Sequence, residues 1–150
     1  MKPGELLDHP EGGHFREVFR SSRLITRADG QSRSALTHIY FSLDSGEISR
    51  FHRVEADEVW NLYRGSGIRL FLWDGSDALP TEIELSTEAG EFCHVVPAGV
   101  WQAAEPIGES VLVGCSVGPG FDFEDFQLID PTGAEARRLF EMEGNWERFI

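Results

Sequence analysis

The chain has 150 residues, of which 41% are hydrophobic and 11% aromatic, and its formal net charge is −13. This composition is typical of one globular domain and not of a disordered chain, and a domain of this length buries roughly 70% of its unfolded surface. Nucleic acids and anionic membrane surfaces require a basic face on their protein partners, so the acidic charge excludes both as expected partners.

The chain also carries no pattern of export or membrane insertion. Its first residues lack a basic region followed by an apolar run, and no apolar run approaches the roughly 18 residues that cross a bilayer. Cys93 and Cys115 both lie in apolar, strand-like surroundings, which indicates buried reduced thiols; the alternative is a disulfide between them. We therefore expect a cytoplasmic protein.

Short segments rich in β-branched and aromatic residues fill most of the chain, separated by glycine, proline or acidic turns. Many short strands at close, regular spacing are typical of an antiparallel sandwich or barrel, so an all-β fold is predicted. In chain order, the predicted strands cover residues 17–26, 35–43, 47–54, 58–65, 68–74, 81–86, 92–97, 100–106 and 110–117.

The end of the chain shows a different pattern. The segment "DPTGAEARRLFEMEGNW" begins with Asp130 and Pro131 and continues with good helix formers, so a short C-terminal helix is predicted. No repeat or low-complexity linker divides the sequence. We expect a single domain over residues 1–150, with a core barrel over about 15–128 and a helical extension over about 131–147.

The stretch "GEISRFHRVEADEVWNLYRG" (residues 46–65) combines the most chemically active side chains of the sequence. Side chains alternate across a strand, so His52 and Glu58 meet across a hairpin if the residues between them turn the chain back. Imidazole titrates near neutrality, and a carboxylate inside a barrel is costly unless it is paired. The pair is expected to act as general acid and base; the alternative is two barrel residues hydrogen-bonded to their neighbours.

Beyond these two residues, the spacing of Gly46, His52 and Glu58 resembles the first of two motifs of the cupin superfamily, and Pro97 and Gly99 fit the second. The blocks "HPEGGHFREVFRS", "SRFHRVEADEVW", "VPAGVWQAA" and "GCSVGPGFDFEDF" are similar to signatures of one branch, the cupin-5 group of largely undefined function. The resemblance implies a double-stranded β-helix, or jelly-roll barrel, usually paired into homodimers.

The sequence departs from the family pattern at the metal positions. A metal-dependent cupin commonly uses three histidines and one glutamate, but here Val54 replaces the second histidine of the first motif and Gln102 replaces the histidine of the second. His52, Glu58 and Gln102 are the candidate metal ligands, although an amide oxygen is a poor ligand beside imidazole. The cofactor stays open between a divalent metal ion and none.

Several side chains near these motifs are candidates for ligand contacts. An inward amide can donate and accept a hydrogen bond at once, and an inward arginine binds carboxylate or phosphate with its planar fork. For each candidate the alternative is packing or a structural hydrogen bond or ion pair. The expected ligand-binding residues are Gln102, Trp60, Arg50, Tyr40, Arg16 and Phe123, of which Phe123 would close the pocket.

Three functions stay open at this point. The first is an enzyme that holds a small polar metabolite, such as a sugar or hydroxy-acid derivative, and uses His52 and Glu58 in isomerase- or epimerase-like proton transfer beside a carbonyl. The resemblance points the same way, because related cupins include sugar isomerases and epimerases. The second is a non-enzymatic small-ligand-binding cupin that has lost its metal site. The third is a mainly structural dimer with a filled barrel.

Overall fold

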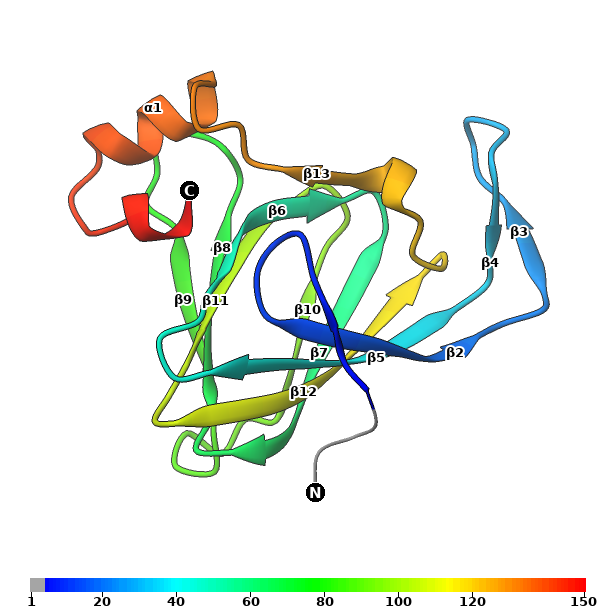
Figure 1. Cartoon of the computed structure of the whole chain (residues 1–150). Helices are drawn as coiled ribbons and strands as arrows, with labels where there is room; N and C mark the ends of the chain where they lie inside the picture. Colours follow the sequence, from blue (N-terminus) through cyan, green and yellow to red (C-terminus); the bar gives the residue numbers. More distant parts are fainter. Residues whose placement is uncertain (1–4) are drawn as a thin grey trace.

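A computed structural model describes residues 5–150, which form two antiparallel sheets that face each other as a barrel (Figure 1). One sheet has the order β1-β2-β5-β12-β7-β10 and the other the order β13-β6-β11-β8-β9. The first sheet consists of β1 (Leu7–Asp8), β2 (His14–Arg20), β5 (Thr37–Asp44), β12 (Ser110–Gly118), β7 (Asp57–Gly65) and β10 (Cys93–Val96). The second consists of β13 (Phe126–Leu128), β6 (Ser49–Val54), β11 (Trp101–Pro106), β8 (Ile68–Trp73) and β9 (Thr81–Leu85).

The predicted all-β fold is confirmed, but one predicted pairing is wrong. The strands that hold His52 and Glu58, β6 and β7, do not form a hairpin with each other. Strand β6 pairs with β11 and β13, whereas β7 pairs with β10 and β12 in the other sheet. The short connection between them therefore crosses from one sheet to the other, and the two side chains enter the barrel from opposite walls.

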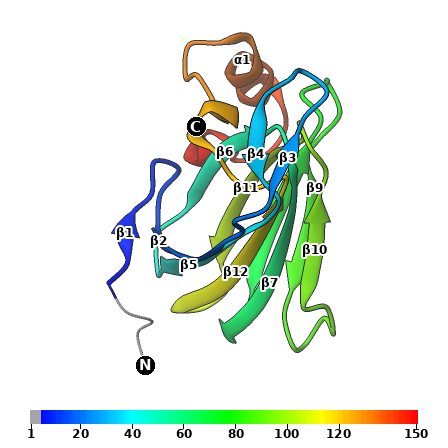
Figure 2. The ribbon, with the colours of Figure 1, turned by 90° about the vertical axis from the view of Figure 1, so that its right-hand side faces the viewer.

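The C-terminal extension covers the outer face of the second sheet (Figures 1 and 2). Helix α1 (Ala134–Glu141) and the 3-10 turn η2 (Glu147–Phe149) bury Leu139 and Phe149 against that face. Successive side chains of strand β6 therefore point to opposite faces of the sheet. Phe51 packs in this outer cluster, and His52 points into the barrel. Within residues 5–150 no helix is long and apolar enough to cross a bilayer.

The loop between β1 and β2 bridges the two sheets at one edge of the barrel. The backbone N–H of Arg50, on β6, donates to the carbonyl oxygen of Glu11 at 2.8 Å. Gly12 makes this approach possible, since its φ is +111° and a Cβ at that position would overlap the carbonyl oxygen of Ile48. The "HPEGG" segment (residues 9–13) thus carries its glutamate to the strand that holds His52.

A second hairpin, formed by β3 (Leu24–Thr26) and β4 (Ser32–Ser34), projects from the barrel (Figure 1). Arg33 and Arg27 tie it to Asp125 in the 3-10 turn η1 (Phe123–Asp125), with nitrogen–oxygen distances of 2.8 and 2.6 Å. This ion-pair cluster holds η1 and the residues before it in place beside the barrel opening.

Candidate functional site

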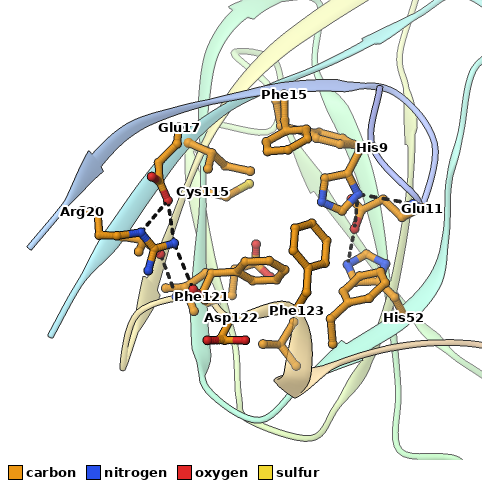
Figure 3. Close-up of a pocket in the computed structure, with 17 residues that line it drawn as sticks. His9, Glu11, Phe15, Glu17, Arg20, His52, Cys115, Phe121, Asp122 and Phe123 are labelled. Atoms are coloured by element: carbon orange, nitrogen blue, oxygen red, sulfur yellow. Dashed lines mark hydrogen bonds and ion pairs between the residues drawn. The ribbon is translucent and has the colours of Figure 1, made fainter. Parts of the chain in front are cut away.

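A pocket of about 300 Å³ lies between the two sheets and is lined by the N-terminal loop, both sheets and the segment before β13 (Figure 3). Most of its wall is apolar. Its charged and titratable groups gather at a buried inner end, formed by Glu11, His52, Glu58 and Cys115, and at an exposed rim, formed by Glu17, Arg20 and Asp122. Five phenylalanine side chains line the space between: Phe15, Phe41, Phe121, Phe123 and Phe126.

At the inner end, His52 and Glu11 form a buried pair. Nε2 of His52 lies 2.9 Å from Oε2 of Glu11, and Nδ1 lies 2.7 Å from the carbonyl oxygen of Arg50. A carbonyl can only accept, so Nδ1 carries a proton. The second carboxylate oxygen of Glu11 accepts a hydrogen bond from Ser49 Oγ at 2.9 Å.

The pairing decides the charges of both side chains. Burial alone disfavours the charged forms, but the charge of Glu11 and its hydrogen bond outweigh burial and raise the pKa of His52. The same interaction, together with the hydrogen bond from Ser49, lowers the pKa of Glu11 despite its burial. The inner end therefore contains an imidazolium–carboxylate ion pair near neutral pH.

Glu58 occupies the opposite wall in a different state. Burial raises its pKa to about 7, and the negative charge of Glu11 adds to that effect, while the charge of His52 and hydrogen bonds from Gln102 and Cys115 oppose it. Burial also raises the pKa of the Cys115 thiol well above its ordinary value, so the thiol stays protonated. Glu58 therefore changes charge near neutrality.

Gln102 lies on β11 in the facing sheet, outside the pocket lining, and hydrogen-bonds Glu58 across the barrel. Its Oε1 accepts from Trp60 Nε1 at 2.7 Å, and its Nε2 donates to Glu58 Oε1 at 2.9 Å. An indole N–H can only donate, so Trp60 fixes which end of the amide faces Glu58. The chain Trp60–Gln102–Glu58 thus presents a hydrogen-bond donor to the carboxyl group.

Trp60→Phe is expected to destabilise the protein by about 1–3 kcal/mol, because it leaves the buried Gln102 oxygen without its donor. Urea denaturation monitored by circular dichroism measures the difference in the free energy of unfolding. Trp101→Phe is the matched control, since Trp101 is equally buried and its indole N–H has no hydrogen-bond acceptor among the described residues. An equal loss of stability in both variants would show that ring volume and not the Gln102 contact sets the effect.

His9, next to the ion pair, is neutral. Its Nδ1 accepts a hydrogen bond from the backbone N–H of Glu11 at 3.2 Å, and burial lowers its pKa. The 3.5 Å approach of Nδ1 to Oε2 of Glu11 is therefore a contact and not an ion pair. The ring packs edge-on against Phe15 at a centroid distance of 4.8 Å and so belongs to the apolar wall.

At the rim, Arg20 forms an ion pair with Glu17 at 2.7 Å and donates to the carbonyl oxygen of Phe121 at 3.1 Å (Figure 3). A β-bulge places Arg20 there. The pairing of β2 with β5 shifts between Glu17 and Phe19, so that both Glu17 and Arg20 face the pocket. Regular alternation would put these two residues on opposite faces of the sheet.

Comparison with known proteins agrees with the fold. Residues 2–129 match the family described as "Cupin superfamily (DUF985)". The chain belongs to this family. The cupin is 31% identical to protein SO0799 from Shewanella oneidensis, with a TM-score of 0.76 over 95% of this chain and 85% of that one.

Two other relatives show the same degree of similarity. A hypothetical protein from Leishmania major is 28% identical, with a TM-score of 0.75 over 90% of this chain and 86% of that one. The uncharacterized protein YML079W of Saccharomyces cerevisiae is 29% identical over 142 residues, which cover 83% of this chain and 71% of the yeast protein.

The cupin's donors do not fit a metal ion as they are arranged. Both ring nitrogens of His52 are engaged, and the Gln102 oxygen is turned toward Trp60. Val54, at the second histidine position, is part of the apolar wall. Among residues 5–150 no three His, Cys, Asp or Glu side chains form a metal-holding group. This arrangement does not support the ligand set His52, Glu58 and Gln102, so the chemistry proposed below uses the chain's own groups.

The structure brings some of the expected ligand-binding residues together and separates others. Phe123 lines the pocket with His52 and Glu58, whereas Gln102 and Trp60 lie outside the lining and form a hydrogen-bonded chain to Glu58. The other three expected residues also lie outside the pocket lining. Arg50 donates from its guanidinium to the carbonyl oxygen of Pro10 at 2.8 Å, and Arg16 lies over the ring of Tyr40 at 5.4 Å.

Three site residues were missed by the sequence reasoning. Glu11 lies in the "HPEGG" segment, which supported the resemblance to the family but supplied no candidate site residue, so the family signature itself was the available signal. Cys115 was correctly expected to be buried, but nothing in the sequence places it beside Glu58. Arg20 could not be found from strand alternation, because the β-bulge in β2 changes the face to which it points. Cys93, also expected to be buried, is exposed on the edge strand β10.

Proposed function

We propose that this cupin is an isomerase-like enzyme that moves a proton between carbons of a small carbonyl compound. The observation that carries the proposal is a buried carboxyl group with a pKa of about 7, Glu58, in a pocket that also holds the imidazolium of His52. A group that titrates near the working pH both accepts and returns a proton readily, which is the requirement for general acid–base catalysis.

The roles follow from the charge states. Ionised Glu58 accepts the proton from the carbon beside the carbonyl, and the positive charge of His52 stabilises the negative charge that develops on oxygen. Glu58 then returns the proton to the neighbouring carbon, while the hydroxyl proton of the substrate passes between its two adjacent oxygens. Nε2 of His52 keeps its proton directed toward Glu11, so His52 acts through its charge. One titrating carboxyl group favours isomerisation, since a single base can remove and return the proton.

The alternative is a non-enzymatic binding protein, and one observation favours it. Each polar group at the inner end has an internal partner: Glu11 for His52, and Gln102 for Glu58. Such a pocket can bind a ligand through its apolar wall without any change in protonation. The two functions differ in whether carbon-bound hydrogen exchanges with solvent.

Exchange of carbon-bound hydrogen in D₂O tests the enzymatic role. Hydroxyacetone and 2-hydroxyacetophenone are incubated with the protein, and ¹H NMR follows the loss of the signal beside the carbonyl. Glu58→Gln and His52→Gln are expected to slow the catalysed exchange by about 10²–10⁴-fold, and the wild-type rate is expected to rise as pH passes about 7, because only the carboxylate accepts the proton.

Glu82→Gln is the control, because it removes an exposed carboxylate on β9, outside the pocket lining, and is expected to leave the exchange rate unchanged. Undiminished exchange in Glu58→Gln would contradict the proposal. Binding of the probes with no exchange above the solvent rate would favour the binding protein instead.

A further inference from the structure

We infer that the natural ligand of this pocket is a molecule with an apolar, ring-sized body and its oxygen functions at one end, and that it is neither a sugar nor an anion. The inference deepens the proposed function and rests on the same pocket. It narrows the class of small polar metabolites expected from the sequence.

The apolar wall excludes a sugar. A sugar carries hydroxyl groups around its whole ring, and every hydroxyl buried without a partner costs about 1–3 kcal/mol. Between the inner end and the rim, the pocket offers phenylalanine rings, with Ile39, Val54 and Val117 completing the wall. A hydroxylated ring would leave most of its polar groups facing hydrocarbon there.

The paired charges exclude an anion. The pocket is lined by two positive side chains, and each already has its own carboxylate: Glu17 for Arg20, and Glu11 for His52. Asp122 adds a further negative charge at the rim, and the chain as a whole carries a net charge of −13. An anionic ligand would have to displace one of these carboxylates while approaching a negative field.

The geometry also sets the size and direction of the ligand. A cavity of about 300 Å³ corresponds to about ten water-sized volumes, so the ligand has about ten non-hydrogen atoms. Its oxygens face Glu58 and His52, the polar groups of the inner end. Its body lies toward the rim, where Phe121 and Phe123 meet edge to face at a centroid distance of 4.9 Å and offer a surface for a third ring.

Isothermal titration calorimetry with three probes of about ten non-hydrogen atoms each tests the inference. The probes are 2-hydroxyacetophenone, the carboxylate mandelate and the sugar xylose. We expect 2-hydroxyacetophenone to bind at least about tenfold more tightly than each of the others. Tighter or equal binding of xylose or of mandelate would overturn the sugar part or the anion part of the inference, respectively.

A matched pair of variants locates the binding site. Phe123→Ala removes part of the pocket wall and is expected to weaken 2-hydroxyacetophenone binding by about 2- to 10-fold. Phe140→Ala removes an equally exposed ring on the outer side of α1, 53% against 52% exposed, and is expected to change nothing. Equal binding by both variants and the wild type would place the probe elsewhere and overturn the inference.

The outcomes separate this inference from the proposed function. Tight, Phe123-dependent binding of 2-hydroxyacetophenone without hydrogen exchange would overturn the enzymatic role and support the ligand class. Exchange on hydroxyacetone that depends on Glu58, without binding of the aromatic probe, would support the enzymatic role and overturn the ligand class.

Discussion

Replacing Glu11 with alanine is expected to destabilise the fold by about 3–5 kcal/mol, because it leaves the buried His52 without the charge that pairs with it. It also removes the acceptor of the Ser49 hydroxyl. Urea denaturation at pH 6, where His52 is protonated in both the folded and the unfolded state, measures the change in the free energy of unfolding.

Two further variants separate charge from packing in this prediction. Glu11→Ala combined with His52→Gln also removes the imidazolium charge that Glu11→Ala alone leaves unpaired. The double variant should therefore lose clearly less stability than the sum of the losses of the two single variants. Glu17→Ala is the control, since Glu17 also forms an ion pair but is exposed, and it should cost at most about 1 kcal/mol. Additive losses in the double variant would mean that the pair does not interact energetically.

The second large effect is a fall in stability with rising pH that depends on Glu58. The pKa of this carboxyl group is about 7 in the folded protein and 4.5 in the unfolded chain. Between these values the folded state keeps a proton that the unfolded chain releases, so unfolding is favoured increasingly as pH rises. Over this range the loss is about 3 kcal/mol, at about 1.4 kcal/mol for each pH unit.

The neighbouring groups titrate differently. Glu11, with its lowered pKa, affects stability below pH 4.5, and His52, with its raised pKa, loses its contribution above pH 6.5. His9 acts below pH 6.5, where stability rises with pH, because burial lowers its pKa and the unfolded chain binds a proton there that the folded protein does not. The difference between wild type and Glu58→Gln, measured by urea denaturation at pH 5 and pH 7.5, isolates Glu58. A constant difference across this range would contradict the raised pKa.

The fold and half of the inner end could be predicted from local patterns. Strands are predicted from the alternation of polar and apolar residues and from the turn residues between them, and both signals come from residues close together in the chain. His52 and Glu58 were found for the same reason, since their spacing lies within one motif. Both side chains do line the pocket, although they reach it from different sheets and not across a hairpin.

The remaining features of the site depend on contacts between residues that are far apart in the sequence. The Trp60 indole determines the orientation of the Gln102 amide, and with it the donor that Glu58 receives. A β-bulge turns Arg20 inward, whereas Arg16, one of the two arginines expected to bind the ligand, lies on Tyr40 outside the pocket. Neither the orientation of the Gln102 amide nor the inward position of Arg20 follows from strand alternation, because each depends on contacts with a neighbouring strand.

The barrel, its C-terminal helix and the two side chains most suited to proton transfer, His52 and Glu58, follow from local patterns in the order of residues. The protonation states of these two side chains follow from contacts in the folded protein. A loop glycine lets Glu11 reach His52, which holds the imidazole charged, and burial on the opposite wall raises the pKa of Glu58. The charge states of buried groups depend on desolvation and on partners that are close in space, and neither can be predicted from residues that are neighbours in the sequence.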